Sequence, residues 1–199
     1  KISDEKVQEV LSVYLKRYDM ENFKSIIRGK LTGVNDEEIA GMLIPSINHE
    51  LEYFTDLMKK EKVEDIIKEL PLDVEIKEME LFAVENALDK AYYFELFELA
   101  NRIRGQGKPI REFFEAELAI LNIKTILRLK KGDYSKEEIT SHLINPSQDV
   151  LELLEKEDVN AMVKLLTKKK MISIDVDDSR GNIMPDVEID LDIALLKKE

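Results

Sequence analysis

The sequence contains no cysteine and no tryptophan, and only seven glycines and five prolines occur among its 199 residues. The absence of cysteine excludes a disulfide framework and thiol chemistry. Charged residues make up 36% of the chain, and this composition, with so little glycine and proline, favours helix. No apolar run approaches the roughly 20 residues that a helix needs to cross a bilayer. We therefore expect a helical chain without a direct membrane span.

Positive charge is also in short supply. The chain has 30 basic and 42 acidic residues, for a formal net charge of −12. Such a surface repels phosphate backbones and anionic lipids, so nucleic acid and bare membrane are poor partners. Cationic protein surfaces are the expected partners.

Motifs that carry chemistry are missing as well. His49 and His142 are the two histidines, and neither has a second histidine or cysteine at metal-ligand spacing. There is no glycine-rich phosphate loop and no nucleophile elbow. Residues 175–186 resemble a calcium loop in their acidic spacing, but Arg180 occupies the position that needs glycine, and no glutamate closes the loop. We expect no catalytic residue, no cofactor and no metal, and we interpret residues 172–182 as a loop or short hairpin.

The most informative feature that is present is an internal repeat. The first 46 residues are echoed one hundred positions later, without a gap, and a second match shifted by three residues pairs Glu85 and Asp89 with Glu188 and Asp192. The sequence thus predicts two tandem homologous lobes, 1–104 and 109–199, and repeated units of this size usually form a scaffold. The positions shared by the first match form a signature: Asn22, Lys24, Ile26, Arg28 and Lys30, echoed by Asn122, Lys124, Ile126, Arg128 and Lys130.

Apolar spacing predicts an all-α fold. Asn35 with Glu38, and Ser135 with Glu138, are capping-box pairs that mark the start of a short helix in each lobe. In the first lobe we expect helices over 7–32, from 35 to near Pro45, and over 48–59, 61–69 and 73–104. In the second lobe we expect them over 110–131, 135–144, 148–155 and 157–169.

The signature residues are interpreted as structural. Asn22 and Asn122 lie on helical stripes where apolar residues are expected, and a buried amide can fix the register of a neighbouring segment. A binding site at these asparagines is the alternative interpretation. Lys24 and Arg28, with their echoes, are expected to point the opposite way, toward solvent, another subunit or the other lobe.

Three stretches resemble a known family. Residues 17–30, their partner 117–130, and residues 85–93 are similar to the C subunit of archaeal A-type ATP synthases, a relative of the d subunit of V-type ATPases. The resemblance implies a funnel of three helical lobes with pseudo-threefold symmetry, of which this chain carries two.

What the resemblance implies about function is a coupling role. Members of the family are not catalytic; they seat the central stalk in the funnel and rest on the cytoplasmic face of the membrane proteolipid ring. Rotation then passes between ion transport and ATP synthesis or hydrolysis. The expected partners are the central-stalk subunits and the proteolipid rotor ring, whereas nucleic acid is not. The alternative is a helical-repeat adaptor that binds a partner protein or peptide in a groove.

The ends of the chain lead to one more expectation. Lys1 is not an initiator methionine, and Glu199 aligns with Leu96, where the first lobe's helix is expected to continue. We therefore expect a fragment that lacks one lobe, whose uncovered faces would allow self-association.

Overall fold

In the computed structural model, the described residues are 4–72, 74, 76, 79–103, 107–173 and 184–196. Within these ranges the secondary structure is helical, as predicted, and contains no strand. The chain divides into two compact units, Lys1–Arg111 and Glu112–Glu199. The division falls inside a helix, a few residues after the glycine-rich stretch at which the sequence predicts a boundary.

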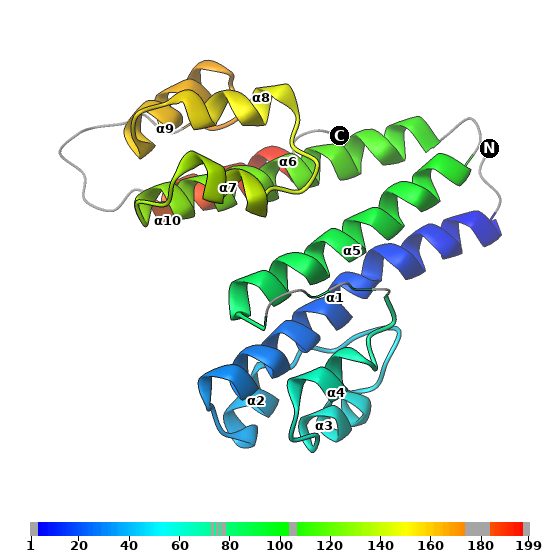
Figure 1. Ribbon diagram of the computed structural model, residues 1–199. Helices are drawn as coiled ribbons and strands as arrows, with labels where there is room; N and C mark the ends of the chain where they lie inside the picture. The colour runs from blue at the N-terminus through cyan, green and yellow to red at the C-terminus, as the bar shows by residue number, and fades with distance from the viewer. Residues whose placement is uncertain are drawn as a thin grey trace. The chain divides into compact units, whose positions relative to one another are not determined.

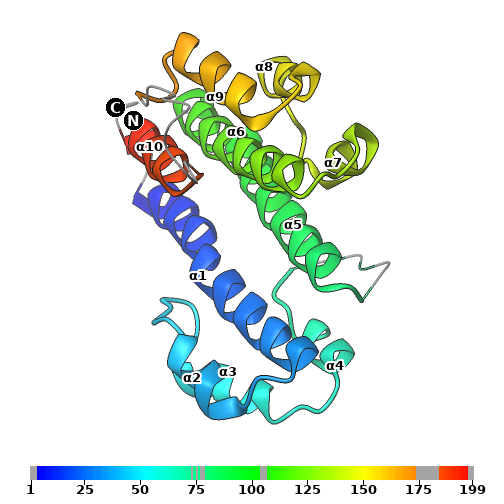
Figure 2. The same ribbon diagram turned by 90° about the vertical axis from the view of Figure 1, so that its left-hand side faces the viewer.

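The first unit is built on two long antiparallel helices, α1 (Asp4–Thr32) and α5 (Leu81–Arg102) (Figure 1). Three short helices lie around the C-terminal end of α1 (Figure 2): α2 (Asp36–Met42), α3 (Leu51–Met58) and α4 (Val63–Ile67). The predicted helix over 7–32 is thus confirmed, and the short helices are present but shorter than predicted. The core of this unit includes fully buried side chains from each long helix and from the short ones: Phe23, Ile26, Ile39, Phe54, Ile66 and Leu88.

The predicted start of the fifth helix near Asp73 is wrong. Helix α5 begins at Leu81, and the described residues between 72 and 81 are not helical. Leu72, Val74 and Ile76 are half-buried at every second position, which is the spacing of an extended segment. Helix propensity is a weak signal that the tertiary surroundings routinely override.

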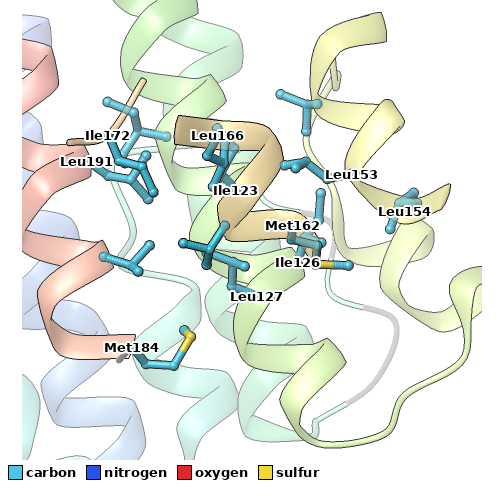
Figure 3. Packing of buried hydrophobic residues seen from close by; sticks show 14 of the residues in the cluster. Ile123, Ile126, Leu127, Leu153, Leu154, Met162, Leu166, Ile172, Met184 and Leu191 are labelled. Atoms are coloured by element: carbon cyan, nitrogen blue, oxygen red, sulfur yellow. The ribbon is translucent and has the colours of Figure 1, made fainter. Parts of the chain in front are cut away.

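The second unit repeats the order long helix, short helices, long helix. It comprises α6 (Gly107–Lys131, from Glu112 onward), α7 (Lys136–His142), α8 (Gln148–Leu151), the 3-10 turn η1 (Glu152–Glu155), α9 (Val159–Lys168) and α10 (Met184–Leu196). Its core joins Ile123, Ile126 and Leu127 of α6 to Leu153 of η1, Met162 and Leu166 of α9, and Met184 and Leu191 of α10 (Figure 3). The predicted loop or hairpin at 172–182 lies almost wholly outside the described residues.

Both units cap their helices at equivalent places. The side chains of Asn35 and Ser135 accept hydrogen bonds from the backbone N–H of Glu38 and Glu138, as the capping-box pattern predicts. The chain reverses after the long helices at Gly33 (φ 74°) and at Asp133 (φ 59°). Glycine adopts this left-handed conformation at no steric cost, and aspartate is among the few other residues that adopt it.

Candidate functional site

The repeated asparagines make the same pair of hydrogen bonds. The side-chain amide of Asn22 donates to the carbonyl of Ile44 at 2.9 Å and accepts from the Ile44 N–H at 2.8 Å. Asn122 does the same with Ile144, at 2.8 and 2.9 Å. Both asparagines are buried. Each amide thus satisfies both polar backbone groups of a residue 22 positions away, and holds the segment after the short helix against the long one.

The repeated lysines cross from the first long helix of each unit to the last. Lys24 Nζ lies 2.5 Å from Asp89 Oδ1 on α5, and Lys124 Nζ lies 2.6 Å from Asp192 Oδ1 on α10. The expectation that Lys24 points to solvent, another subunit or the other lobe is therefore wrong. Its side chain is largely buried, and its partner belongs to the same unit.

The repeated arginines make the parallel contact one turn further along. Arg28 Nε and Nη2 donate to Glu85 Oε1 at 2.9 and 2.6 Å. Arg128 Nε and Nη2 donate to the two oxygens of Glu188 at 2.7 and 2.8 Å, a bidentate pair. Both arginines are largely exposed, but each is tied to a helix of its own unit. We call the asparagine, lysine and arginine contacts together the helix clamp.

The remaining signature residues have different structural roles. Ile26 and Ile126 are fully buried in the cores of their units. Lys30 forms an ion pair with Asp36 at 2.9 Å, at the first turn of α2. Lys130 lines an open hollow of ≈ 400 Å³ between the end of α6 and the start of α9.

The pKa shifts of the charged groups differ between the two clamps because the groups are buried to different extents. Burial raises the pKa of the Asp89 carboxyl above its ordinary 3.8, and the Lys24 ammonium offsets only part of this. Burial also acts to lower the pKa of Lys24, but the carboxylates of Asp89 and Glu21 outweigh it, so that pKa is raised. In the second unit, the hydrogen bond from Arg128 lowers the pKa of Glu188 below its ordinary 4.5.

A signal for this pairing was present in the sequence. The basic residues stand four apart on the first long helix of each unit, and Glu85 and Asp89 are also four apart, as are their echoes. Residues four apart share one face of a helix. On antiparallel helices two such faces meet in opposite sequence order, which pairs Lys24 with Asp89 and Arg28 with Glu85. The repeat of both pairs together predicts the clamp, whereas the repeat of the basic pair alone does not.

One buried cluster has no counterpart in the sequence prediction. Asp19, fully buried on α1, accepts hydrogen bonds from Ser46 Oγ and from Asn48 Nδ2 at 3.1 Å, and His49 Nδ1 lies 3.3 Å from it. The available signal was an acidic residue on the same helical stripe as Phe23 and Ile26. We call this the Asp19 cluster. The serine donates directly to the carboxylate, which is not the arrangement of a hydrolase triad, where serine meets histidine.

The described residues hold no group of three or more His, Cys, Asp or Glu side chains that could bind a metal ion. The calcium-like stretch at 175–186 lies outside these residues except for its last three, which begin α10. The polar contacts that recur in both units join segments of the same unit to one another.

These features define an all-helical protein in which each of the two units contains its own copy of the same polar clamp. The chain belongs to the family of the ATP synthase (C/AC39) subunit, which it matches over residues 1–198.

Individual relatives point the same way. The chain is 28% identical over 209 aligned positions to the C subunit of the A-type ATP synthase of Methanococcoides burtonii, covering 92% of this chain and 58% of the relative. It is 33% identical to the corresponding protein of Archaeoglobus fulgidus, covering 63% of this chain and 38% of the relative. With the corresponding protein of Pyrococcus horikoshii the identity is 30%, over 80% and 45% of the two chains. The chain thus spans at most about three-fifths of these relatives. No solved structure matches it.

Proposed function

We propose that this chain is a non-catalytic coupling subunit of a rotary A/V-type ATP synthase or ATPase. It links the central stalk to the membrane proteolipid ring on the cytoplasmic side and passes rotation between ion transport and ATP synthesis or hydrolysis. Family membership over residues 1–198 is the observation that carries this proposal.

The helix clamp supports a mechanical role. A part that transmits torque must resist bending, and each unit ties its two long helices together by a lysine and an arginine contact one turn apart. We assign Asn22 and Asn122 to holding register, and the clamp cations to joining helices within each homologous lobe.

The described helices are compatible with attachment through protein partners. None of them combines the length and apolar character that crossing a bilayer requires. In the proposed complex, the chain therefore reaches the membrane through the proteolipid ring.

The test is a binding measurement. The purified chain is titrated against purified central-stalk subunits and, separately, against the detergent-solubilised proteolipid ring, with a full-length relative from the family as the positive control. We expect saturable binding of the chain to at least one of the two. Because both clamps stiffen the body, Asp89→Ala with Asp192→Ala should weaken binding in the same assay.

Two outcomes would redirect the proposal. If only the full-length control binds, the partner surface lies in the part of the relatives that this chain does not span. If neither binds, while the chain captures isolated helical peptides, the adaptor interpretation replaces the coupling role.

A further inference from the structure

The segment that joins α2 to α3 presents apolar side chains to solvent. Ile47 is 73% exposed, Met42 54%, Leu51 43% and Ile44 36%. Single exposed apolar residues are ordinary, but four within ten consecutive positions concentrate exposed apolar surface, which is typical of interaction sites. We call residues 42–51 the apolar segment.

This segment is held in a defined conformation. The Asn22 amide binds both backbone groups of Ile44, and the Asp19 cluster holds Ser46 and Asn48 against α1. The ring of His49 stacks on that of Tyr53 with centroids 4.3 Å apart. A pre-organised surface loses less entropy on binding than a mobile loop would.

The surroundings of the segment are acidic. Residues 31–58 contain no lysine and no arginine. They contain six acidic residues: Asp36, Glu37, Glu38, Glu50, Glu52 and Asp56. Lys30 and Lys59, just outside the stretch, pair with Asp36 and Asp56. Glu37, Glu50 and Glu52 are exposed and form no ion pair within the described part of the chain. Glu37, Glu50 and Glu52 thus supply exposed negative charge within the apolar segment or up to five positions from it, and we call these three residues the acidic rim.

The second unit lacks this combination. Histidine and serine stand at positions 142 and 147, where the first unit has Met42 and Ile47, and Ile144 is only 8% exposed. Its equivalent stretch, residues 131–158, includes three lysines. The patch is thus not a by-product of the repeated fold, because the repeat without it keeps the same asparagine contact.

We propose that the apolar segment and its acidic rim form a docking surface for a basic amphipathic segment of a partner protein. The apolar side chains take the partner's apolar face, and Glu37, Glu50 and Glu52 meet its lysines or arginines. The sign of the rim disfavours an anionic membrane or a nucleic acid at this place. This inference goes beyond the coupling role, because it holds for whichever assembly carries the chain.

The test uses two synthetic amphipathic helices of about 18 residues. One carries leucine and lysine, and the other has the same pattern with glutamate in place of lysine. Their binding to the folded chain is measured by calorimetry at low and at physiological salt. We expect the lysine peptide to bind at least about tenfold more tightly than the glutamate peptide, with a difference that shrinks as salt rises.

Variants locate the binding. Ile47→Glu and Met42→Glu should each weaken the lysine peptide by about tenfold, and so should Glu50→Lys with Glu52→Lys. Matched controls are Phe94→Glu, an equally exposed apolar residue on α5, and Glu98→Lys on the same helix. They should leave the affinity within about twofold. All sites are exposed, so circular dichroism should show unchanged helix content.

Several results would overturn the proposal. These are no binding of the lysine peptide, equal binding of both peptides, or equal weakening by the controls. Sedimentation of the chain alone that reveals a dimer abolished by Ile47→Glu would reassign the surface to a second copy. Binding to phosphatidylcholine vesicles that Ile47→Glu abolishes would reassign it to lipid.

Discussion

The two units make the same clamp in different surroundings. Lys24 and Asp89 have side chains that are 11% and 22% exposed, whereas Asp192, the partner of Lys124, is 62% exposed. Glu21 adds a second carboxylate 3.1 Å from Lys24, and the equivalent position in the second unit is a leucine. A buried charge without its partner is costly, while an exposed ion pair contributes little. The repeat has thus preserved the geometry of the contact, while the burial of its charged groups has diverged.

A second difference lies beside the clamp. The first unit adds the Asp19 cluster, and the second has alanine at the equivalent position 119. Both units keep the asparagine contact to the segment after the short helix. The second unit thus places that segment without an equivalent of the Asp19 cluster, and the cluster is an addition in the unit whose segment displays exposed apolar side chains.

The largest difference between the units should come from removing the clamp carboxylates. Asp89→Ala should destabilise the first unit by roughly 3 kcal/mol, at the low end for a broken buried pair because Glu21 still faces Lys24. Asp192→Ala should cost the second unit less than about 1 kcal/mol. Hydrogen exchange read by mass spectrometry resolves the two units. Equal losses of protection in both would contradict the inferred role of burial.

The asparagines should behave alike, in contrast to the lysine pairs. Asn22→Ala and Asn122→Ala each leave the N–H and C=O of an isoleucine without their partner, at a cost of about 2 kcal/mol. Chemical denaturation of the two variants should show shifts that agree within about 0.5 kcal/mol. A much larger shift for either variant would show that the same pair of hydrogen bonds contributes different amounts of stability in the two units.

The Asp19 cluster should matter only to the first unit. Asp19→Ala restores the residue type of the second unit but leaves Ser46 and Asn48 without their acceptor, so we expect a loss of about 1 to 2 kcal/mol. Exchange of residues 42–51 should accelerate, while that of residues 142–151 should not. Unchanged protection in 42–51 would show that Asn22 alone holds the segment.

The smallest effect should be a difference in pH dependence. The pKa of Glu188 is lowered from its ordinary 4.5, so its contribution is present above pH 4.5 and is lost as the pH falls through the folded-state value. The pKa of Asp89 is raised, so protonation of this group acts in the opposite direction and favours the folded first unit. Glu188→Gln should therefore lower stability by about 0.5 kcal/mol at pH 7 and by less in acid. A constant difference across pH would contradict the pairing with Arg128.

Helices and caps were predictable from the sequence because their signals are local. The spacing of apolar residues predicts α1, and the capping-box pattern predicts the starts of α2 and α7. The expected start of α5 near Asp73 is wrong because it depends on helix propensity, a weak signal that the tertiary surroundings override.

The clamp was only half predictable. The repeat identifies its cations, but their partners lie 57 to 68 positions away, where no local pattern indicates which carboxylate each cation meets. The Asp19 cluster leaves no repeat at all, because the second unit lacks the aspartate. Features unique to one copy are therefore the ones that require a structure.

The most direct test of the proposed coupling role is ion transport by a reconstituted rotary complex from which the corresponding coupling protein has been stripped. Adding the chain, alone or within a full-length version of that protein, should restore ATP-driven ion transport without changing the affinity of the catalytic head for nucleotide. Transport that stays coupled to ATP hydrolysis in the stripped complex, or that neither form restores, would contradict it.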